Sequence, residues 1–414
     1  MKKKNLYPWL MMLLLFEFLF FMMPGMNSTV NLFVVPVSEE LGVSRSVYSL
    51  SFAVSSGAMV ALSFFYGKIY KRFGARKIIL LTGVFALAAC FVSAKADHIA
   101  VIYLGALLRG IVLGLGSTAI VGNVLFNWFN QYRGLVMGIT FSAVGFGGAA
   151  LMPVFTYWVA GTNVGWRDAY LYIGGIVFVS CIIAGLLIKG SPEEVDAIPF
   201  GEDITNRMDD KAKESNSGAS LKTILKSAPF IASAVIVLLV NFSLYSTYAH
   251  LQAYLDMKNC DLAIIASALS ILAFAVGGAK LVYGFVSDKF GMRVTALMAA
   301  SFHVLSLALL LFGKTNIIFL LGCIVLGFGI GALQLSVSLF AGIFGKEHYS
   351  FIVGIFSAEL GLAWGIGPWL TGLYYDLFGN YQGIFSLFLV FGVIMGGFAF
   401  MMPKKQQERL DSKS

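Results

Sequence analysis

Four ionisable residues stand inside long apolar stretches of the sequence, namely Glu17, Arg109, Lys280 and Glu359. A charge surrounded by hydrocarbon is costly, so such residues pair with one another, face a water-filled cavity, or do both. A buried cation can bind a carboxylate, and a buried carboxyl group can take up and release a proton. Their formal charges cancel, so structural pairing is the alternative interpretation of each residue.

Glu359 and Glu17 are the candidates for carrying protons, and Arg109 is a candidate for relaying charge. Glu17 lies about ten residues, or roughly 15 Å, into its apolar stretch. Arg109 can handle protons or the charge of a substrate. It can equally pair with Glu17 or lie at a helix C-terminus. The residue types alone leave both interpretations of Arg109 open.

Uncharged polar residues form a second group of candidates. Pro24 and Gly25 can interrupt the first apolar stretch and free backbone groups that must then face protein or water. Polar residues recur after this point and in later stretches, and a hydrogen bond between helices is the simpler role for any one of them. Together they predict a polar centre. We expect four of them to contact a substrate: Asn27, Asn123, Tyr245 and Gln334.

The elements that must position these residues are apolar helices. Apolar and aromatic types make up 58% of the 414 residues, and only 12% are charged, which is about half the share in a soluble domain. This composition excludes a water-soluble globule, a disordered chain and a disulfide scaffold. The apolar runs are continuous rather than alternating, which is typical of helices and not of barrel strands. The sequence therefore predicts an all-α membrane protein.

Twelve stretches are long enough to cross a bilayer, which takes roughly 20 helical residues. They cover residues 8–36, 46–66, 78–94, 99–123, 134–160, 168–188, 229–255, 262–285, 293–313, 316–343, 350–374 and 381–402. Two small-residue patterns, Gly110-x-x-x-Gly114 and Gly361-x-x-x-Gly365, are typical of close packing between such helices.

One long polar segment separates the sixth and seventh stretches and is typical of a cytoplasmic linker. We therefore expect two six-helix halves, at residues 1–188 and 229–402, with a linker at 189–228 and a tail at 403–414.

The charges also indicate an orientation. With the N-terminal lysines inside, the inner segments hold 22 of the 29 Lys and Arg residues, so we expect both termini in the cytoplasm of a multi-pass protein of the plasma membrane. The net charge of +8 then reflects this topology rather than binding to nucleic acid.

An internal repeat relates the two halves. The segment Gly67–Lys77 follows the second stretch and resembles Gly284–Arg293, which follows the eighth, at an offset of 217 residues. A second match, Ile111–Gly116 against Ile324–Gly329, has an offset of 213 residues. Parallel repeats of this kind are known from secondary transporters, with a midplane site at the repeat interface.

With this repeat, the chain resembles the major facilitator superfamily. Both loops look like that family's G-x-[LV]-x-D-[RK]-x-G-x-[RK] signature, and the resemblance implies twelve helices in two pseudo-symmetric halves. The residues that would form this gating-loop motif are Gly67, Arg72, Gly74, Arg76, Gly284, Asp288, Gly291 and Arg293. The first copy departs from the signature, because Lys71 occupies the acidic position and cannot supply the negative charge of the contact that the family implies there.

Within the superfamily, the chain resembles the monocarboxylate transporter and oxalate/formate antiporter group. The likeness is carried by Trp128-Phe129, Arg133-Gly-Leu135, Gly138, Gly145-x-Gly147, Pro153, Gly165-Trp-Arg167, Pro199-Phe-Gly201 and Gly277-Gly278-x-Lys280. It implies that Lys280 is a substrate-binding cation. The antiporter's second cation has no counterpart in Phe356–Leu360, which favours a monocarboxylate over a dicarboxylate. Val276 stands where the animal-type pattern has an acid, so a proton relay must use another residue.

These observations predict a secondary active transporter of a small organic anion, working by alternating access with proton symport or anion exchange. A multidrug or amphiphile exporter is one alternative, although Ala143–Gly148 lacks the proline of the exporter pattern. A transport-silent nutrient sensor is another. Four His and four Cys are scattered without metal-ligand spacing, and no nucleophile, base and acid can be grouped, so we expect no enzyme activity, metal or cofactor. The expected partners are the anion, protons or a counter-anion, and the lipid bilayer; we expect a monomer.

Overall fold

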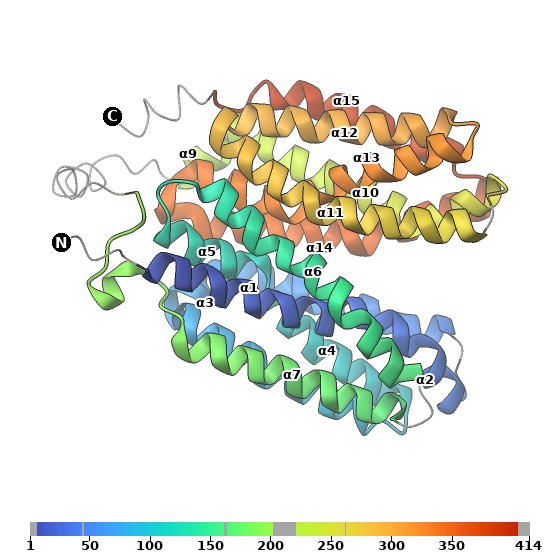
Figure 1. Ribbon diagram of the computed structural model, residues 1–414, viewed down its shortest axis with the longest axis horizontal. Helices are drawn as coiled ribbons and strands as arrows, with labels where there is room; N and C mark the ends of the chain where they lie inside the picture. Colours follow the sequence, from blue (N-terminus) through green and yellow to red (C-terminus); the bar gives the residue numbers. More distant parts are fainter. Residues whose placement is uncertain (1–5, 44, 161–163, 202–220, 261, 405–414) are drawn as a thin grey trace. The chain divides into compact units, whose positions relative to one another are not determined.

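The computed structural model describes residues 6–43, 45–160, 164–201, 221–260 and 262–404, and helices dominate all of these ranges (Figure 1). The chain divides into two compact units. The first unit contains α1 to α5, α7, the part of α6 from Thr140 onward, and Ser350–Gly361 of α14. The second unit contains Phe129–Ile139, α9 to α13, α15 and the rest of α14.

The first unit is built from long helices joined by short turns. Its α3 packs against α4 and α7, and α1 packs against α7. The elements in chain order are α1 (Tyr7–Met23), η1 (Pro24–Ser28), η2 (Thr29–Phe33), α2 (Val34–Glu40), α3 (Arg45–Ala94), α4 (Ile99–Leu115), α5 (Thr118–Trp128), α6 (Arg133–Ala160), α7 (Gly165–Leu187) and η3 (Pro192–Val195).

The second unit has the same character. Its α13 packs against α11 and α12, and α15 packs against α12 and α10. The elements are α9 (Leu221–Leu225), α10 (Ala228–Met257), α11 (Leu262–Phe290), α12 (Met292–Phe312), α13 (Asn316–Ala341), η5 (Gly342–Phe344), α14 (Gly345–Phe378) and α15 (Gln382–Ala399).

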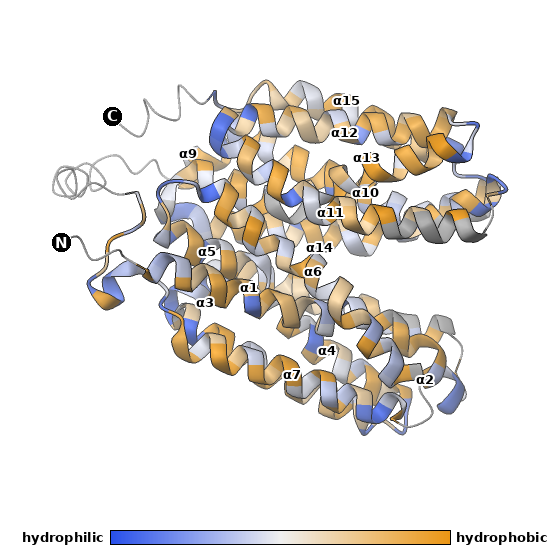
Figure 2. Cartoon of the chain, in the orientation of Figure 1, coloured by the Kyte–Doolittle hydropathy of each residue, from blue (hydrophilic) through white to orange (hydrophobic). Residues whose placement is uncertain are grey.

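Eleven helical segments among the described residues are long and apolar enough to span a membrane. One of them, Leu50–Ala94, has 45 residues, about twice what a bilayer core requires. It is broken at Gly74, where φ is 69° and ψ is 168°, so it supplies two spans and the total is twelve. Hydrophobic residues follow the lengths of the helices and hydrophilic ones gather mainly at their ends (Figure 2). The prediction of an all-α protein with twelve spans is therefore confirmed.

The first predicted span, 8–36, is not one regular helix. Its α1 ends at Met23, where Pro24 begins one π-helical turn that is followed by a 3₁₀ turn and then by α2. The Thr29 hydroxyl donates to the Gly25 carbonyl oxygen at 2.7 Å, which occupies one backbone group of the irregular region. Proline lacks the N–H that a regular helix needs, so a change of hydrogen-bonding pattern is expected at this place.

The fourth predicted span, 99–123, corresponds to a longer span, Ile99–Trp128, whose helix is interrupted. Its helix stops at Leu115 and restarts as α5, which runs to Trp128. The Gly116 N–H donates to the Val112 carbonyl oxygen at 2.7 Å, and the Ser117 hydroxyl accepts from the Ala119 N–H at 3.3 Å. A glycine followed by a serine can thus end one helix and cap the next.

Small residues permit close helix packing at most of the predicted positions. A β-carbon added to Gly110 would lie 2.3 Å from the Ser55 carbonyl oxygen, and one added to Gly361 would lie 2.6 Å from Val60 Cγ2. The prediction was wrong for Gly365, where an added β-carbon would meet no atom of the described residues within 4 Å.

The repeat is also visible in the backbone. Gly74 and Gly291 are 217 residues apart, and both end a helix with positive φ and extended ψ, 69° and 168° at Gly74 and 84° and 173° at Gly291. This region is open to glycine and almost closed to other residues. The boundaries of the predicted halves, including the linker at 189–228, stay a prediction, and much of that linker, residues 202–220, lies outside the described residues.

We predict that Gly291→Ala lowers the free energy of unfolding by about 1–3 kcal/mol, since the side chain forces a strained backbone conformation. The measurement is thermal unfolding of the purified protein in detergent micelles. Gly396→Ala is the matched control, because Gly396 is helical and an added β-carbon there meets no described atom within 4 Å. Equal melting temperatures for the two variants would contradict the prediction.

Candidate functional site

Lys280 lies on α11 in the second unit and is only 4% exposed. The start of α6 approaches it closely, since a β-carbon added to Gly138 would lie 2.5 Å from the Lys280 carbonyl oxygen. The glycine at position 138 therefore allows α6 to pack backbone against backbone on the turn that carries the lysine.

A buried tyrosine accompanies Lys280 on the same side of α11. Tyr283 is three residues further along the helix, which places the two side chains on neighbouring positions of one face. It is 1% exposed, and its hydroxyl has no hydrogen-bond partner among the described residues. An ammonium and a phenol O–H both donate hydrogen bonds, so this face of α11 favours a ligand that accepts them.

Two other predicted substrate contacts, Tyr245 and Gln334, belong to the second unit. Tyr245 stacks on Trp364 with a centroid distance of 4.9 Å and an interplanar angle of 19°. The Trp364 indole N–H is buried and has no partner within the described part of the chain. The side chain of Gln334 lies outside the described residues, so its predicted contact with substrate stays a prediction.

Asp288 of the second loop caps a helix. Its carboxylate accepts hydrogen bonds from the backbone N–H groups of Gly134 at 2.8 Å and Leu135 at 2.7 Å, in the first turn of α6. These amides have no partner inside the helix, and a carboxylate there is also favoured by the helix dipole. Gly284 allows the contact, because a β-carbon on it would lie 2.3 Å from the Gly134 carbonyl oxygen. Arg293, after the turn at Gly291, donates to the Met402 carbonyl oxygen at 2.8 Å.

The first loop lacks such a cap. A β-carbon on Gly67 would lie 3.1 Å from Phe351 Cα, so this glycine also meets the backbone of another helix, α14. Lys71 and Arg76 are exposed, and the Arg72 guanidinium lies 5.7 Å from the centre of the Phe73 ring. The two copies of the motif therefore share the close glycine contact but differ in the charge at the acidic position.

Arg109 of α4 forms contacts that neither structural alternative predicted. Its Nε donates to Ser55 Oγ at 3.2 Å and its Nη2 to the Ser51 carbonyl oxygen at 3.4 Å, both on α3. It forms no ion pair with Glu17 or with any other described carboxylate, which contradicts the alternative of a structural pair. It does not cap a helix C-terminus either, since Ser51 lies in the second turn of α3.

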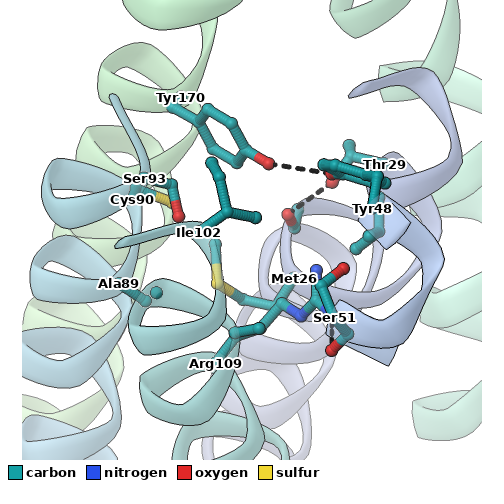
Figure 3. A pocket seen from close by; sticks show the side chains of 14 residues that line it. Met26, Thr29, Tyr48, Ser51, Ala89, Cys90, Ser93, Ile102, Arg109 and Tyr170 are labelled. Atoms are coloured by element: carbon teal, nitrogen blue, oxygen red, sulfur yellow. Dashed lines mark hydrogen bonds between the residues drawn. The ribbon is translucent and has the colours of Figure 1, made fainter. Parts of the chain in front are cut away.

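A cavity of about 20 Å³ opens beside Arg109 in the first unit (Figure 3). The Tyr48 and Tyr170 hydroxyls point toward one another across it and are 3.2 Å apart. Ser51 Oγ also lines the cavity, is buried, and has no hydrogen-bond partner among the described residues. The backbone irregularity after Pro24 contributes Gly25 and Met26 to the wall.

Both predicted proton carriers have a carboxylate oxygen without a partner. Glu17 Oε2 and Glu359 Oε2 are buried and accept no hydrogen bond within the described ranges. Ser180 of α7 lies beside Glu17 and likewise has an unsatisfied hydroxyl oxygen. Glu359 lies on the part of α14 that belongs to the first unit, between Gly354, which packs on Ser63, and Gly361. Such groups are able to change protonation without breaking a structural ion pair.

Asn123 is fully engaged in holding helices together. Its Nδ2 donates to the Tyr66 hydroxyl at 3.2 Å and to the Ala119 carbonyl oxygen at 2.9 Å, and its Oδ1 accepts from Ser350 Oγ at 2.5 Å. These bonds connect α5 with α3 and α14 inside the first unit, so they support the simpler interpretation of this residue. Asn27 is half-buried, and no such connection to it is found among the described residues.

The Gly165-Trp-Arg167 motif forms an ionic cluster at the start of α7. Glu40 Oε2 accepts from the Trp166 indole N–H at 2.5 Å, and Arg167 Nη2 lies 3.0 Å from Glu40 Oε1 and 3.3 Å from Asp97 Oδ1. Arg167 Nη1 donates to the Ala94 carbonyl oxygen at 2.9 Å. The hydrogen bond from Trp166, followed by the bond and charge of Arg167, holds the pKa of the Glu40 carboxyl below its ordinary value.

Sequence reasoning missed several polar residues of these surroundings. Tyr283 had a usable signal, since it follows Lys280 by three residues on one helix. No local pattern joins Tyr48 to Tyr170, which are 122 positions apart. Ser51 and Trp364 are single polar groups in apolar runs and carry no distinguishing spacing.

Comparison with known proteins agrees with this architecture. Residues 16–341 match the sequence profile of the family described as the Major Facilitator Superfamily. The chain is 26% identical over 296 residues to the oxalate:formate antiporter of Oxalobacter formigenes, covering 70% of this chain and 65% of the antiporter. It is 24% identical over 410 residues to monocarboxylate transporter 6 of Homo sapiens, covering 92% of this chain and 78% of that protein.

A solved structure shows the same fold. The chain superimposes on the proton:xylose symporter XylE with a TM-score of 0.77 and 14% sequence identity, and the match covers 96% of each chain. This likeness confirms the predicted major facilitator fold, and at this identity it shows the fold alone.

We predict that Glu40→Gln lowers the melting temperature at pH 7 and that the gap to the parent protein closes as the pH falls. Because the folded-state pKa of Glu40 is below its ordinary value of about 4.3, its ionised form stabilises the fold above that value. The stabilisation is lost as the pH falls through the lowered pKa. Glu39→Gln, on the exposed neighbour, should leave the melting temperature unchanged at each pH. A gap that stays constant down to acid pH would contradict the prediction.

Proposed function

The chain belongs to the major facilitator superfamily, and from this premise we propose that it carries a small monocarboxylate across the membrane, by alternating access with proton symport or anion exchange. It is a multi-pass integral membrane protein and a secondary transporter, not an enzyme. The distribution of Lys and Arg supports placement in the plasma membrane with both termini in the cytoplasm.

The observation that carries the proposal is the pair of donors on α11. Lys280 is 4% exposed and Tyr283 is 1% exposed, and the two lie on one face of the helix. A carboxylate has the opposite charge to the buried ammonium, and it accepts hydrogen bonds from both an ammonium and a phenol O–H. Lysine is a point charge without the planar fork of arginine, so this site selects for charge more than for the plane of the carboxylate.

Two further observations support the substrate class. The relatives named above are an oxalate:formate antiporter and a monocarboxylate transporter, so anion transport occurs among proteins similar to this one. The segment Phe356–Leu360 supplies a glutamate and no second cation. One buried lysine suits one carboxylate, which favours lactate, pyruvate or formate over oxalate.

We predict that Lys280→Gln reduces counterflow of labelled monocarboxylate at least about tenfold, since a charged hydrogen bond to the substrate is lost. The measurement uses proteoliposomes and compares lactate, pyruvate, formate and oxalate. Lys280→Arg should retain part of the activity because it keeps the charge. Lys314→Gln, which removes the same charge from an exposed loop, is the control. Parent-like counterflow by Lys280→Gln would show that the substrate is held elsewhere.

We predict that Glu359→Gln abolishes accumulation driven by a proton gradient but preserves counterflow, because glutamine cannot carry a proton. The parent protein and Glu17→Gln are measured beside it in the same liposomes, with and without an imposed pH gradient. If Glu359→Gln still accumulates substrate and Glu17→Gln does not, Glu17 is the coupling residue. If the parent itself ignores the gradient, the transporter is an exchanger.

A further inference from the structure

We propose that the cavity beside Arg109 is a binding site for one small monovalent anion, a halide or a single carboxylate group, and that it binds this anion independently of Lys280. The residues that would hold it are Arg109, Tyr48, Tyr170 and Ser51, all in the first unit (Figure 3). The site goes beyond the proposed transport function, since it uses none of the residues assigned to the substrate on α11.

Several donors at the cavity have no acceptor among the described residues. A guanidinium has five N–H groups, and Arg109 uses one toward Ser55 Oγ and one toward the Ser51 carbonyl oxygen. Three N–H groups therefore stay available. The Tyr48 and Tyr170 hydroxyls share one hydrogen bond, which uses one of their two protons and leaves the other to donate. Ser51 is 1% exposed, and its hydroxyl has no hydrogen-bond partner among the described residues.

The charge at the cavity is not balanced by the described side chains. No aspartate or glutamate is among the described residues that line the cavity, and Arg109 forms no ion pair with a described carboxylate. Its contact with an aromatic ring, 5.8 Å from the centre of Phe52, supplies only a weak partial compensation. An uncompensated cation inside a membrane-spanning helix costs free energy, and a bound anion removes that cost.

The size of the cavity limits the ligand. About 20 Å³ exceeds the roughly 10–15 Å³ that one water molecule requires, yet it is far below the volume of a drug-sized pocket. A water molecule can accept two of the free hydrogen bonds but leaves the charge unbalanced. A halide or a carboxylate as small as formate satisfies both demands, and a bulkier anion such as gluconate does not fit.

The walls hold the donors in place before any ligand arrives. The Tyr170 ring stacks on Phe33 with centroids 3.7 Å apart and planes inclined by 10°, and Trp166 meets it edge-on at 6.1 Å. The Thr29 hydroxyl, also at the wall, is already committed to the Gly25 carbonyl oxygen. The π-helical turn Pro24–Ser28 forms part of the wall, and such turns occur frequently at functional sites.

The test is ligand-dependent thermal stability of the full chain in detergent, performed on the Lys280→Gln variant so that α11 contributes no lysine. Sodium chloride, bromide and formate are titrated at constant ionic strength against sodium gluconate, an anion too large for the cavity. We expect chloride, bromide or formate to raise the melting temperature in a saturable manner and gluconate to leave it unchanged. A response to halides alone assigns a halide site, and a response to formate alone assigns a carboxylate site.

Variants of the cavity complete the test. In the same background, Arg109→Gln should raise the half-saturating concentration at least about tenfold, through loss of the charge. Tyr170→Phe and Ser51→Ala should each raise it several-fold, and they decide the matter if Arg109→Gln does not fold. Tyr172→Phe, on the exposed face of the same helix, should not change it. Equal melting temperatures in all four salts would overturn the proposal, because a cavity that holds only water gives that result. A half-saturating concentration that stays the same in the three cavity variants would also overturn it.

Discussion

The cost of placing a charge among apolar helices is the constraint on which this structure depends. It is met differently at each of the four intramembrane charges. Arg109 donates to a serine hydroxyl and a backbone carbonyl of α3, whereas Glu17 and Glu359 each keep one carboxylate oxygen without a partner among the described residues. Lys280 is buried one turn from an unsatisfied tyrosine hydroxyl. Structural ion pairs would have satisfied the same constraint more simply, and Arg109, Glu17 and Glu359 form none with the described residues, which points to function at these three positions.

Hydropathy predicted the spans because a helix of about 20 consecutive apolar residues has the length and composition that a bilayer core requires. It could not predict how each helix is rotated. A helix that is apolar all round carries no periodic signal for its buried face, so the meeting of Tyr48 with Tyr170 could not be anticipated. The same limit applies to the break at Gly116, since a glycine and a serine inside an apolar run are also compatible with an unbroken helix.

Residue type alone distinguishes a charged candidate from its apolar surroundings more clearly than an uncharged one. A charge is rare in a span, so Arg109 and Lys280 stand out, whereas an asparagine has two common roles. Asn123 shows the structural role, with its amide nitrogen and oxygen both occupied by neighbouring helices. An amide whose nitrogen and oxygen are already bonded to protein groups would have to break those hydrogen bonds to bind a substrate. The free energy lost with them is comparable to the free energy gained from the new bonds.

The departure of the first loop from its repeat partner has a physical explanation in the lengths of the helices. Asp288 is needed because α6 begins at Arg133, so the amides of Gly134 and Leu135 lie in the first turn and lack partners. The residue 217 positions after Gly134 is Phe351, which Gly67 contacts in the first unit. Its helix, α14, begins six residues earlier, at Gly345, so the Phe351 amide already has a carbonyl partner within the helix. With no unsatisfied amide at that place, a carboxylate would cap nothing, and Lys71 costs the fold no hydrogen bond there.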